Sequence, residues 1–186
     1  MKLSLNIALK EWAITCRALR DNRQIVLLRK GGILEARNGF QIAHDRFLLF
    51  PTYLHQSLPQ VKTDVHHWFE AATVEPAKII INTACEVTDI IKLKSRAQMT
   101  AIDDYHIWTQ PLIDLRFDYK PQNPLFLLLV RAYQLDKDVI IDNTPRHAGC
   151  KSWVAITDAI STGGAIPTMP DEQFDEMRQR ILTALA

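Results

Sequence analysis

The chain has 186 residues, and 47% of them are hydrophobic, so it is long enough to bury a substantial core. Its 22 Lys and Arg residues nearly balance 21 Asp and Glu residues, and the formal net charge of +1 excludes a protein that binds nucleic acid through its overall charge. The most apolar run, PLFLLLV at residues 124–130, is far too short to span a bilayer.

In the first half of the chain, the sequence predicts a helix, two strands, a second helix and a further strand. Residues 4–20 favour a helix capped by Ser4, because apolar residues recur at spacings of four and three. Strands are predicted at residues 23–30 and 46–51, and we expect them to pair with each other across residues 31–45. A helix from about Thr63 and a central strand at residues 78–87 follow.

The second half predicts three helices and two strands. Ser95 and Thr109 are candidate caps of two helices. Residues 124–135 form the strongest predicted strand, and its continuous apolar half indicates burial on both faces. A last strand is predicted at residues 149–156, and residues 171–185 close the chain as a helix that begins at Asp171.

This order of elements predicts an α+β fold in one domain, residues 1–186, with a mixed, largely antiparallel sheet or partial barrel packed by helices. A doubly wound α/β sheet is the alternative fold. It ranks second because it needs helices and strands that alternate regularly, and these do not. Three cysteines, Cys16, Cys85 and Cys150, lie in apolar segments. They indicate reduced thiols in a cytoplasmic protein. Because the longest apolar run is short, no membrane association is expected.

The first candidate site is RKGG at residues 29–32, which lacks the spacing of a Walker A loop or of a dinucleotide-binding loop. Glycine lets a backbone approach an anion closely, and Arg29 and Lys30 beside Gly31 would neutralise that anion. An ordinary turn is the alternative interpretation of the same four residues.

The second candidate site is FPTYLHQ at residues 50–56, just beyond a predicted strand end. Thr52, His55 and Gln56 are its chemically able side chains, and His55 could be a general base near neutral pH. The alternative is a structural histidine held by hydrogen bonds.

The third candidate site is GCKSWV at residues 149–154, where Lys151 and Trp153 share one face of a strand and Ser152 the other. A lysine beside an indole can hold an anionic ligand that carries a stackable ring. Alternatively, Trp153 belongs to the core and Lys151 to a sheet edge.

Two arginines lie in apolar surroundings, Arg116 and Arg131, and we expect structural ion pairs with Asp114, Asp118 or Glu86 in preference to ligand contacts. No metal site is predicted, because His66 and His67 would diverge on a helix and His147 and Cys150 lack a second pair of ligands. No cofactor is expected.

Five motifs in order resemble a bacterial family of uncharacterised proteins, the domain of unknown function 1802. The resemblance covers about residues 8–156, and its motifs are ALKEWA, LLRKGGI, FLLFPTYLHQ, HIWT and GCKSWV. It brings no known activity. It implies that a set of polar residues belongs to the family signature: Arg29, Lys30, Gly31, Pro51, Thr52, His55, Gln56, Lys151, Ser152 and Trp153.

Three functions remain open on these residues. The first is a module that binds a nucleotide, RNA or DNA in a basic pocket, with Trp153 stacking on a base and Gln56 reading its edge. The second is a metal-independent enzyme on phosphoesters or nucleobases, with His55 as base, Lys30 or Lys151 stabilising an anion, and Ser152 or Thr52 orienting the substrate. The third is a structural or partner-binding protein. The element order is loosely similar to PUA-like domains, which is a fold-level analogy.

Overall fold

The computed structural model describes residues 4–30, 33–36, 39–149 and 151–186, with the backbone alone for 33–36 and 39–41. Gly31 and Cys150 therefore lie outside the described residues. No helix of the described part is long and apolar enough to cross a membrane.

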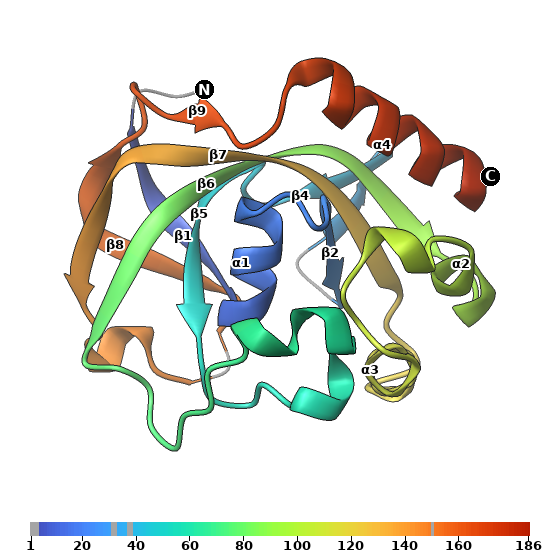
Figure 1. Ribbon diagram of the computed structural model, residues 1–186, viewed down its shortest axis with the longest axis horizontal. Helices are drawn as coiled ribbons and strands as arrows, with labels where there is room; N and C mark the ends of the chain where they lie inside the picture. Colours follow the sequence, from blue (N-terminus) through green and yellow to red (C-terminus); the bar gives the residue numbers. More distant parts are fainter. Residues whose placement is uncertain (1–3, 31–32, 37–38, 150) are drawn as a thin grey trace.

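Seven described strands form one curved sheet in the order β2-β7-β6-β5-β1-β8, with β9 added beside β7 (Figure 1). Only the β1–β5 pair is parallel among these strands, and the others are antiparallel. The predicted α+β fold with a mixed, largely antiparallel sheet is confirmed, and the doubly wound alternative is wrong. The strands are β1 (Ser4–Trp12), β2 (Val26–Arg29), β3 (Ile33–Ala36), β4 (Gly39–Ile42), β5 (Arg46–Thr52), β6 (Lys78–Leu93), β7 (Leu125–Asp142), β8 (Trp153–Ser161) and β9 (Ile166–Pro167).

The helices pack around this sheet. In Figure 1, β6 and β7 arch across the molecule, α1 lies under the arch, and α4 lies on its outer side. The α-helices are α1 (Ala13–Arg20), α2 (Arg96–Ala101), α3 (Gln110–Asp118) and α4 (Asp171–Leu185). Short 3-10 turns span Leu58–Gln60, Thr63–Trp68, Asp103–Tyr105 and Pro145–His147.

The predicted helix over residues 4–20 is wrong in its first half, which is strand β1. Ile7, Ala8 and Leu9 are apolar in succession, as in a strand covered on both faces. β1 lies between β5 and β8, and Ala8 and Leu9 are fully buried there. The helical spacing of Leu5, Leu9 and Trp12 was misleading, because tertiary pairing overrides such a short pattern.

The predicted pairing of residues 23–30 with residues 46–51 is also wrong. β2 pairs with β7, whereas β5 pairs with β1 and β6. The connection between them contains its own two-stranded hairpin, β3–β4. The strands themselves were placed correctly, but their partners come from distant parts of the sequence.

Arg131 forms a structural ion pair, as the sequence indicates, but with a partner that we did not expect. Its guanidinium pairs with Asp171 at the start of α4, donates to the Met169 carbonyl at 2.9 Å, and lies 4.6 Å from the centre of the Phe174 ring. These contacts fix α4 against β7 and leave Arg131 no role in a pocket.

Candidate functional site

A pocket of about 670 Å³ lies where the ends of β1, β2 and β5 meet the loop before β8. Four of the five sequence motifs contribute to its wall: ALKEWA through Lys10, Glu11 and Trp12; LLRKGGI through Arg29; FLLFPTYLHQ through Phe50, Thr52, Leu54 and His55; and GCKSWV through Gly149, Lys151 and Ser152. Glu75, Arg116, Asn143, Thr144, Pro145, His147 and Ala148 complete the lining. Segments far apart in the chain therefore meet at one cavity.

Arg29 is the most enclosed cation of the pocket. It ends β2, and its side chain is only 10% exposed. Its nearest ionic partner is Glu11, with 3.9 Å between Nη1 of Arg29 and Oε2 of Glu11, which is beyond hydrogen-bond distance. None of the described residues forms a hydrogen bond with the Arg29 guanidinium. Burial, opposed by Glu11, lowers the pKa of Arg29 from its ordinary value.

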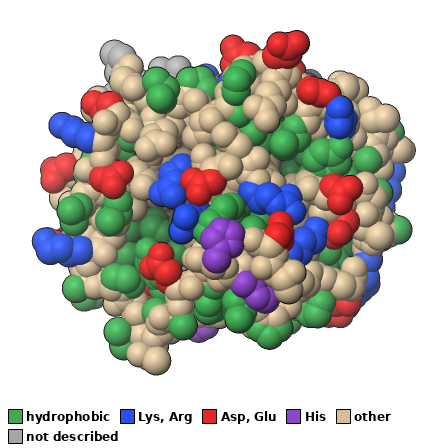
Figure 2. Space-filling view, viewed as in Figure 1, with side chains coloured by type: hydrophobic (Ala, Val, Ile, Leu, Met, Phe, Trp, Pro, Cys, Tyr) green, Lys and Arg blue, Asp and Glu red, His purple; other side chains and the backbone are tan. Residues whose placement is uncertain are grey.

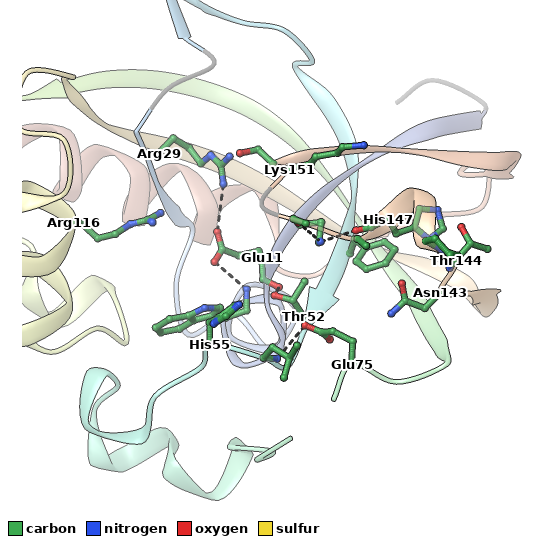
Figure 3. A pocket seen from close by; sticks show the side chains of 18 residues that line it. Glu11, Arg29, Thr52, His55, Glu75, Arg116, Asn143, Thr144, His147 and Lys151 are labelled. Carbon is green, nitrogen blue, oxygen red and sulfur yellow. Dashed lines mark hydrogen bonds and ion pairs between the residues drawn. The ribbon is translucent and has the colours of Figure 1, made fainter. Parts of the chain in front are cut away.

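Arg116 lies beside Arg29 and comes from the far end of α3. One Nη of Arg116 donates to the Leu28 carbonyl at 2.8 Å, which orients the guanidinium along the end of β2. In Figure 3 the side chains of Arg29 and Arg116 both extend towards Glu11. The expected ion pair of Arg116 with Asp114 or Asp118 is not formed, because Arg96 binds both of those carboxylates.

The two carboxylates of the pocket are held by backbone amides. Oε1 of Glu11 accepts from the Trp12 amide at 3.0 Å, and the Thr52 hydroxyl donates to the Glu11 carbonyl at 3.1 Å. Glu75 accepts from the Tyr53 amide at 3.0 Å. Both side chains therefore have fixed positions that do not depend on the arginines.

The other end of the pocket is the loop that precedes β8. Nζ of Lys10 donates to the carbonyls of His147 at 2.7 Å and of Gly149 at 3.0 Å. Nδ1 of His147 accepts from the Thr144 amide at 3.3 Å, and the imidazole packs edge-on against Phe50. These contacts hold the loop over β1, so the exposed Lys151 and Ser152 lie at the rim of the pocket.

His55 is exposed and lines the pocket, and its backbone has a φ of 70°. Such a conformation is uncommon for a residue with a side chain, although histidine is enriched in it. Strained backbone of this kind clusters at ligand sites. His55 has no hydrogen-bond partner among the described residues.

Two predicted site residues face elsewhere. Nζ of Lys30 donates to the Arg116 carbonyl at 3.0 Å and the Phe117 carbonyl at 2.8 Å, so it caps the end of α3. Partial burial, followed by the charge of Arg116, lowers the pKa of the Lys30 ammonium. Gln56 accepts from the Ile14 amide at 3.0 Å and donates to the Glu70 carbonyl at 3.0 Å, which holds the start of α1.

Trp153 is also absent from the pocket wall. Its indole packs edge-on against Phe47 at 5.2 Å and His44 at 5.0 Å between ring centres. The predicted pairing of Lys151 and Trp153 around one ligand is not found, because only Lys151 lies at the pocket.

A small apolar slot adjoins the pocket, and sequence reasoning missed it. Its volume is about 100 Å³, and it shares Glu11, Trp12 and Arg116 with the pocket. Leu28, Trp108, Leu112 and Leu115 complete its lining. The motifs ALKEWA and HIWT supply Trp12 and Trp108, but no role in a site was predicted for either tryptophan.

The face of the molecule drawn in Figure 2 is mixed in charge. Figure 2 shows Lys and Arg side chains interspersed with Asp and Glu side chains over the face it presents. That face has no extended basic surface, so its charges do not favour a duplex lying across it. Among the described residues no cluster of three His, Cys, Asp or Glu side chains could hold a metal ion.

Residues 8–180 match the model of a family described as domain of unknown function (DUF1802). The chain belongs to this family. The match extends beyond the motifs into α4, and the resemblance predicted from the sequence is confirmed.

No curated protein sequence matches this DUF1802 chain. Among solved structures it is similar to the ASCH protein from Zymomonas mobilis, with 10% identity, a TM-score of 0.44, and coverage of 95% of this chain and 93% of that chain. Two point mutants of the same protein give 9% identity and TM-scores of 0.44 and 0.45, covering 93% of this chain and 96% and 94% of theirs. This likeness is too distant to carry an argument, and the PUA-like analogy stays a prediction.

Proposed function

We propose that the pocket binds a phosphorylated nucleoside, either as a free nucleotide or as the phosphorylated end of an RNA or DNA strand. The observation that carries this proposal is the Arg29 guanidinium, which is nearly buried, faces the cavity, and has only a loose ionic partner. A buried charge with poorly matched partners is costly, and an anion bound beside it removes that cost.

The composition of the wall supports phosphate as that anion. Four cations line the described pocket, Lys10, Arg29, Arg116 and Lys151, against the two carboxylates Glu11 and Glu75. Two adjacent guanidinium groups present planar sets of donors, which match the oxygens of a phosphate. Lys10 gives two of its three donors to carbonyls, whereas Arg116 gives one of five to Leu28, so we assign Arg29 and Arg116 to the phosphate.

The size of the pocket supports a small ligand or a strand end. A cavity of about 670 Å³ lies within the range of small-molecule sites, roughly 300–1,000 Å³. A nucleic-acid duplex is bound instead by a row of exposed cations on the protein that contact its phosphate backbone. His55, Thr52 and Ser152 line the same pocket and would give polar contacts to the sugar.

The test is the melting temperature of the protein against inorganic phosphate, AMP, and tetranucleotides of RNA and DNA with and without a 5′-phosphate. A ligand at one hundred times its Kd stabilises the folded state by about 2.7 kcal/mol. For a chain of this length that corresponds to about 5–10 °C. We expect shifts with the phosphorylated compounds and none with the dephosphorylated tetranucleotides.

Two pocket variants and one control variant separate this pocket from unspecific binding. Arg29→Met keeps the bulk of the side chain and should abolish the shift. Lys151→Ala should weaken binding and flatten its salt dependence without changing the melting temperature of the free protein. Lys94→Ala removes another exposed lysine, one outside the pocket, and should change nothing. Equal losses from Lys151→Ala and Lys94→Ala, or no shift with any phosphorylated compound, would refute the proposal.

A further inference from the structure

The apolar slot beside the pocket has the features of a subsite for a flat ring. Its inner wall consists of Leu28, Trp108 and Leu112, which are at most 5% exposed. Its outer wall is Leu115, which is 52% exposed. Leu115 therefore forms the solvent-facing rim of the slot, where its side chain is accessible to a bound ring.

The slot and the pocket are continuous, because Arg116, Glu11 and Trp12 line both. Arg116 is held in place by the Leu28 carbonyl, so its guanidinium forms part of the wall between the two cavities. A ligand with an anion at Arg29 and Arg116 therefore has its next group at the entrance of the slot. That group meets an indole, leucine side chains and one carboxylate.

We infer that the slot is the base subsite of the pocket, and that it takes the nucleobase of a phosphorylated nucleoside against Trp12. The inference rests on the proposed function. The proposed function does not say where the base binds or which side chain it contacts, and the inference assigns the base to the slot and to Trp12. A slot of about 100 Å³ is several times the roughly 10–15 Å³ that one water needs, so it has room for a flat base. Indole and leucine faces bind bases by stacking and by apolar contact, whatever the sequence.

Glu11 gives the site a polar acceptor between the pocket and the slot. Its carboxylate is anchored on the Trp12 amide and lines both cavities, so it is a fixed acceptor at the boundary between them. The hydroxyl groups of a sugar are donors that such an acceptor binds. The order of groups along the site is therefore phosphate at the arginines, sugar at Glu11 and base in the slot.

The first experiment compares the affinities of three probes for the full chain by calorimetry: inorganic phosphate, ribose 5-phosphate and AMP. Stacking of a base on an aromatic side chain gives a gain of at least about fivefold in affinity. We therefore expect AMP to bind at least about fivefold more tightly than ribose 5-phosphate. If a 5′-phosphorylated tetranucleotide binds as tightly as AMP, the site is assigned to the end of a strand. If the tetranucleotide binds more weakly than AMP, the site is assigned to a free nucleotide.

The second experiment changes the rim of the slot. Leu115→Ser should weaken AMP about three- to tenfold and leave ribose 5-phosphate unchanged, because only the base touches residue 115. The change is tolerated, since exposed substitutions rarely alter stability. Tyr119→Ser is the matched control: Tyr119 is 55% exposed, directly follows the same helix, and does not line the slot.

The outcomes separate the two proposals. If none of the three probes binds, the proposed function and the base subsite both fail. If phosphate and ribose 5-phosphate bind but AMP binds no more tightly, only the base subsite fails. Equal weakening of AMP and ribose 5-phosphate by Leu115→Ser, or equal effects of Leu115→Ser and Tyr119→Ser on AMP, would also overturn it. Loss of the AMP advantage in Trp12→Leu, with ribose 5-phosphate still bound, would support it.

Discussion

Replacing Glu11 by glutamine tests how much Glu11 stabilises the free protein by its charge beside the buried Arg29. The change removes the negative charge but keeps a carbonyl that can accept from the Trp12 amide. The charged atoms of Glu11 and Arg29 lie 3.9 Å apart, and their side chains are 14% and 10% exposed. Removing one partner of a buried pair costs about 3–5 kcal/mol.

The loss should be smaller here, because the pair lacks a hydrogen bond and keeps some contact with water. We expect about 2 kcal/mol, which lowers the melting temperature of the free protein by about 4–8 °C. The affinity for phosphate should rise about tenfold, equivalent to about 1.4 kcal/mol, because Glu11 no longer competes with the anion for Arg29.

The assay measures melting temperature with and without saturating phosphate in wild type, Glu11→Gln and Glu75→Gln. Glu75 is a second carboxylate of the pocket, and among the described residues it has no ionic contact with an arginine. Phosphate should recover most of the stability lost in Glu11→Gln and add little in Glu75→Gln. A lower melting temperature in Glu11→Gln that phosphate does not recover would refute the reasoning, since it would make Glu11 a structural residue only.

Three further predictions concern residues outside the ligand contacts. His106 is fully buried; its Nδ1 accepts from the Trp108 amide and its Nε2 faces the Met99 carbonyl, so it is the neutral tautomer. Burial, reinforced by Lys62, lowers its pKa to about 4 from 6.5. Because the unfolded state binds the proton first, stability should be complete above about pH 6.5 and fall by up to about 3 kcal/mol as the pH drops to 4. His106→Gln should remove that part of the pH dependence, measured by urea denaturation at pH 7 and 4.5, and an unchanged slope would contradict it. Gln56→Ala should lower stability by about 1 kcal/mol, because the start of α1 loses its acceptor, while the Kd of phosphate stays the same. Lys30→Met should likewise cost about 1 kcal/mol, because two carbonyls at the end of α3 lose their donor, and a changed Kd would show that Lys30 acts in the site after all.

The sequence predicted the sheet class and most strands, because their signals are local. The apolar run at residues 125–130 is buried throughout, as predicted. Strand partners were not predictable in this way, since β1 pairs with β5 and β8 through contacts that no local pattern encodes. The same limit explains why residues 4–12 were assigned to a helix.

For the candidate site, too, sequence reasoning predicted the local features and not the packing. The motifs identified segments that do meet at one pocket, but side-chain direction within each motif depends on the packed structure. Arg29 faces the pocket and its neighbour Lys30 caps a helix. Trp153 packs against Phe47, whereas Trp12 lines the cavity. Sequence reasoning missed Glu11, and it expected a structural ion pair for Arg116 in preference to the pocket position that the structure shows.

Strand β1 has a consequence for how the chain is made. It lies inside the sheet, and one of its two neighbours, β8, begins at residue 153. Translation proceeds at about 5–20 residues per second, so roughly 8–30 s pass before that neighbour emerges from the ribosome. During this interval Ala8 and Leu9 have at most the β5 side of their final surroundings. Until β8 is made, the edge of β1 that β8 covers in the folded protein stays unpaired, and such an open edge can pair with another chain.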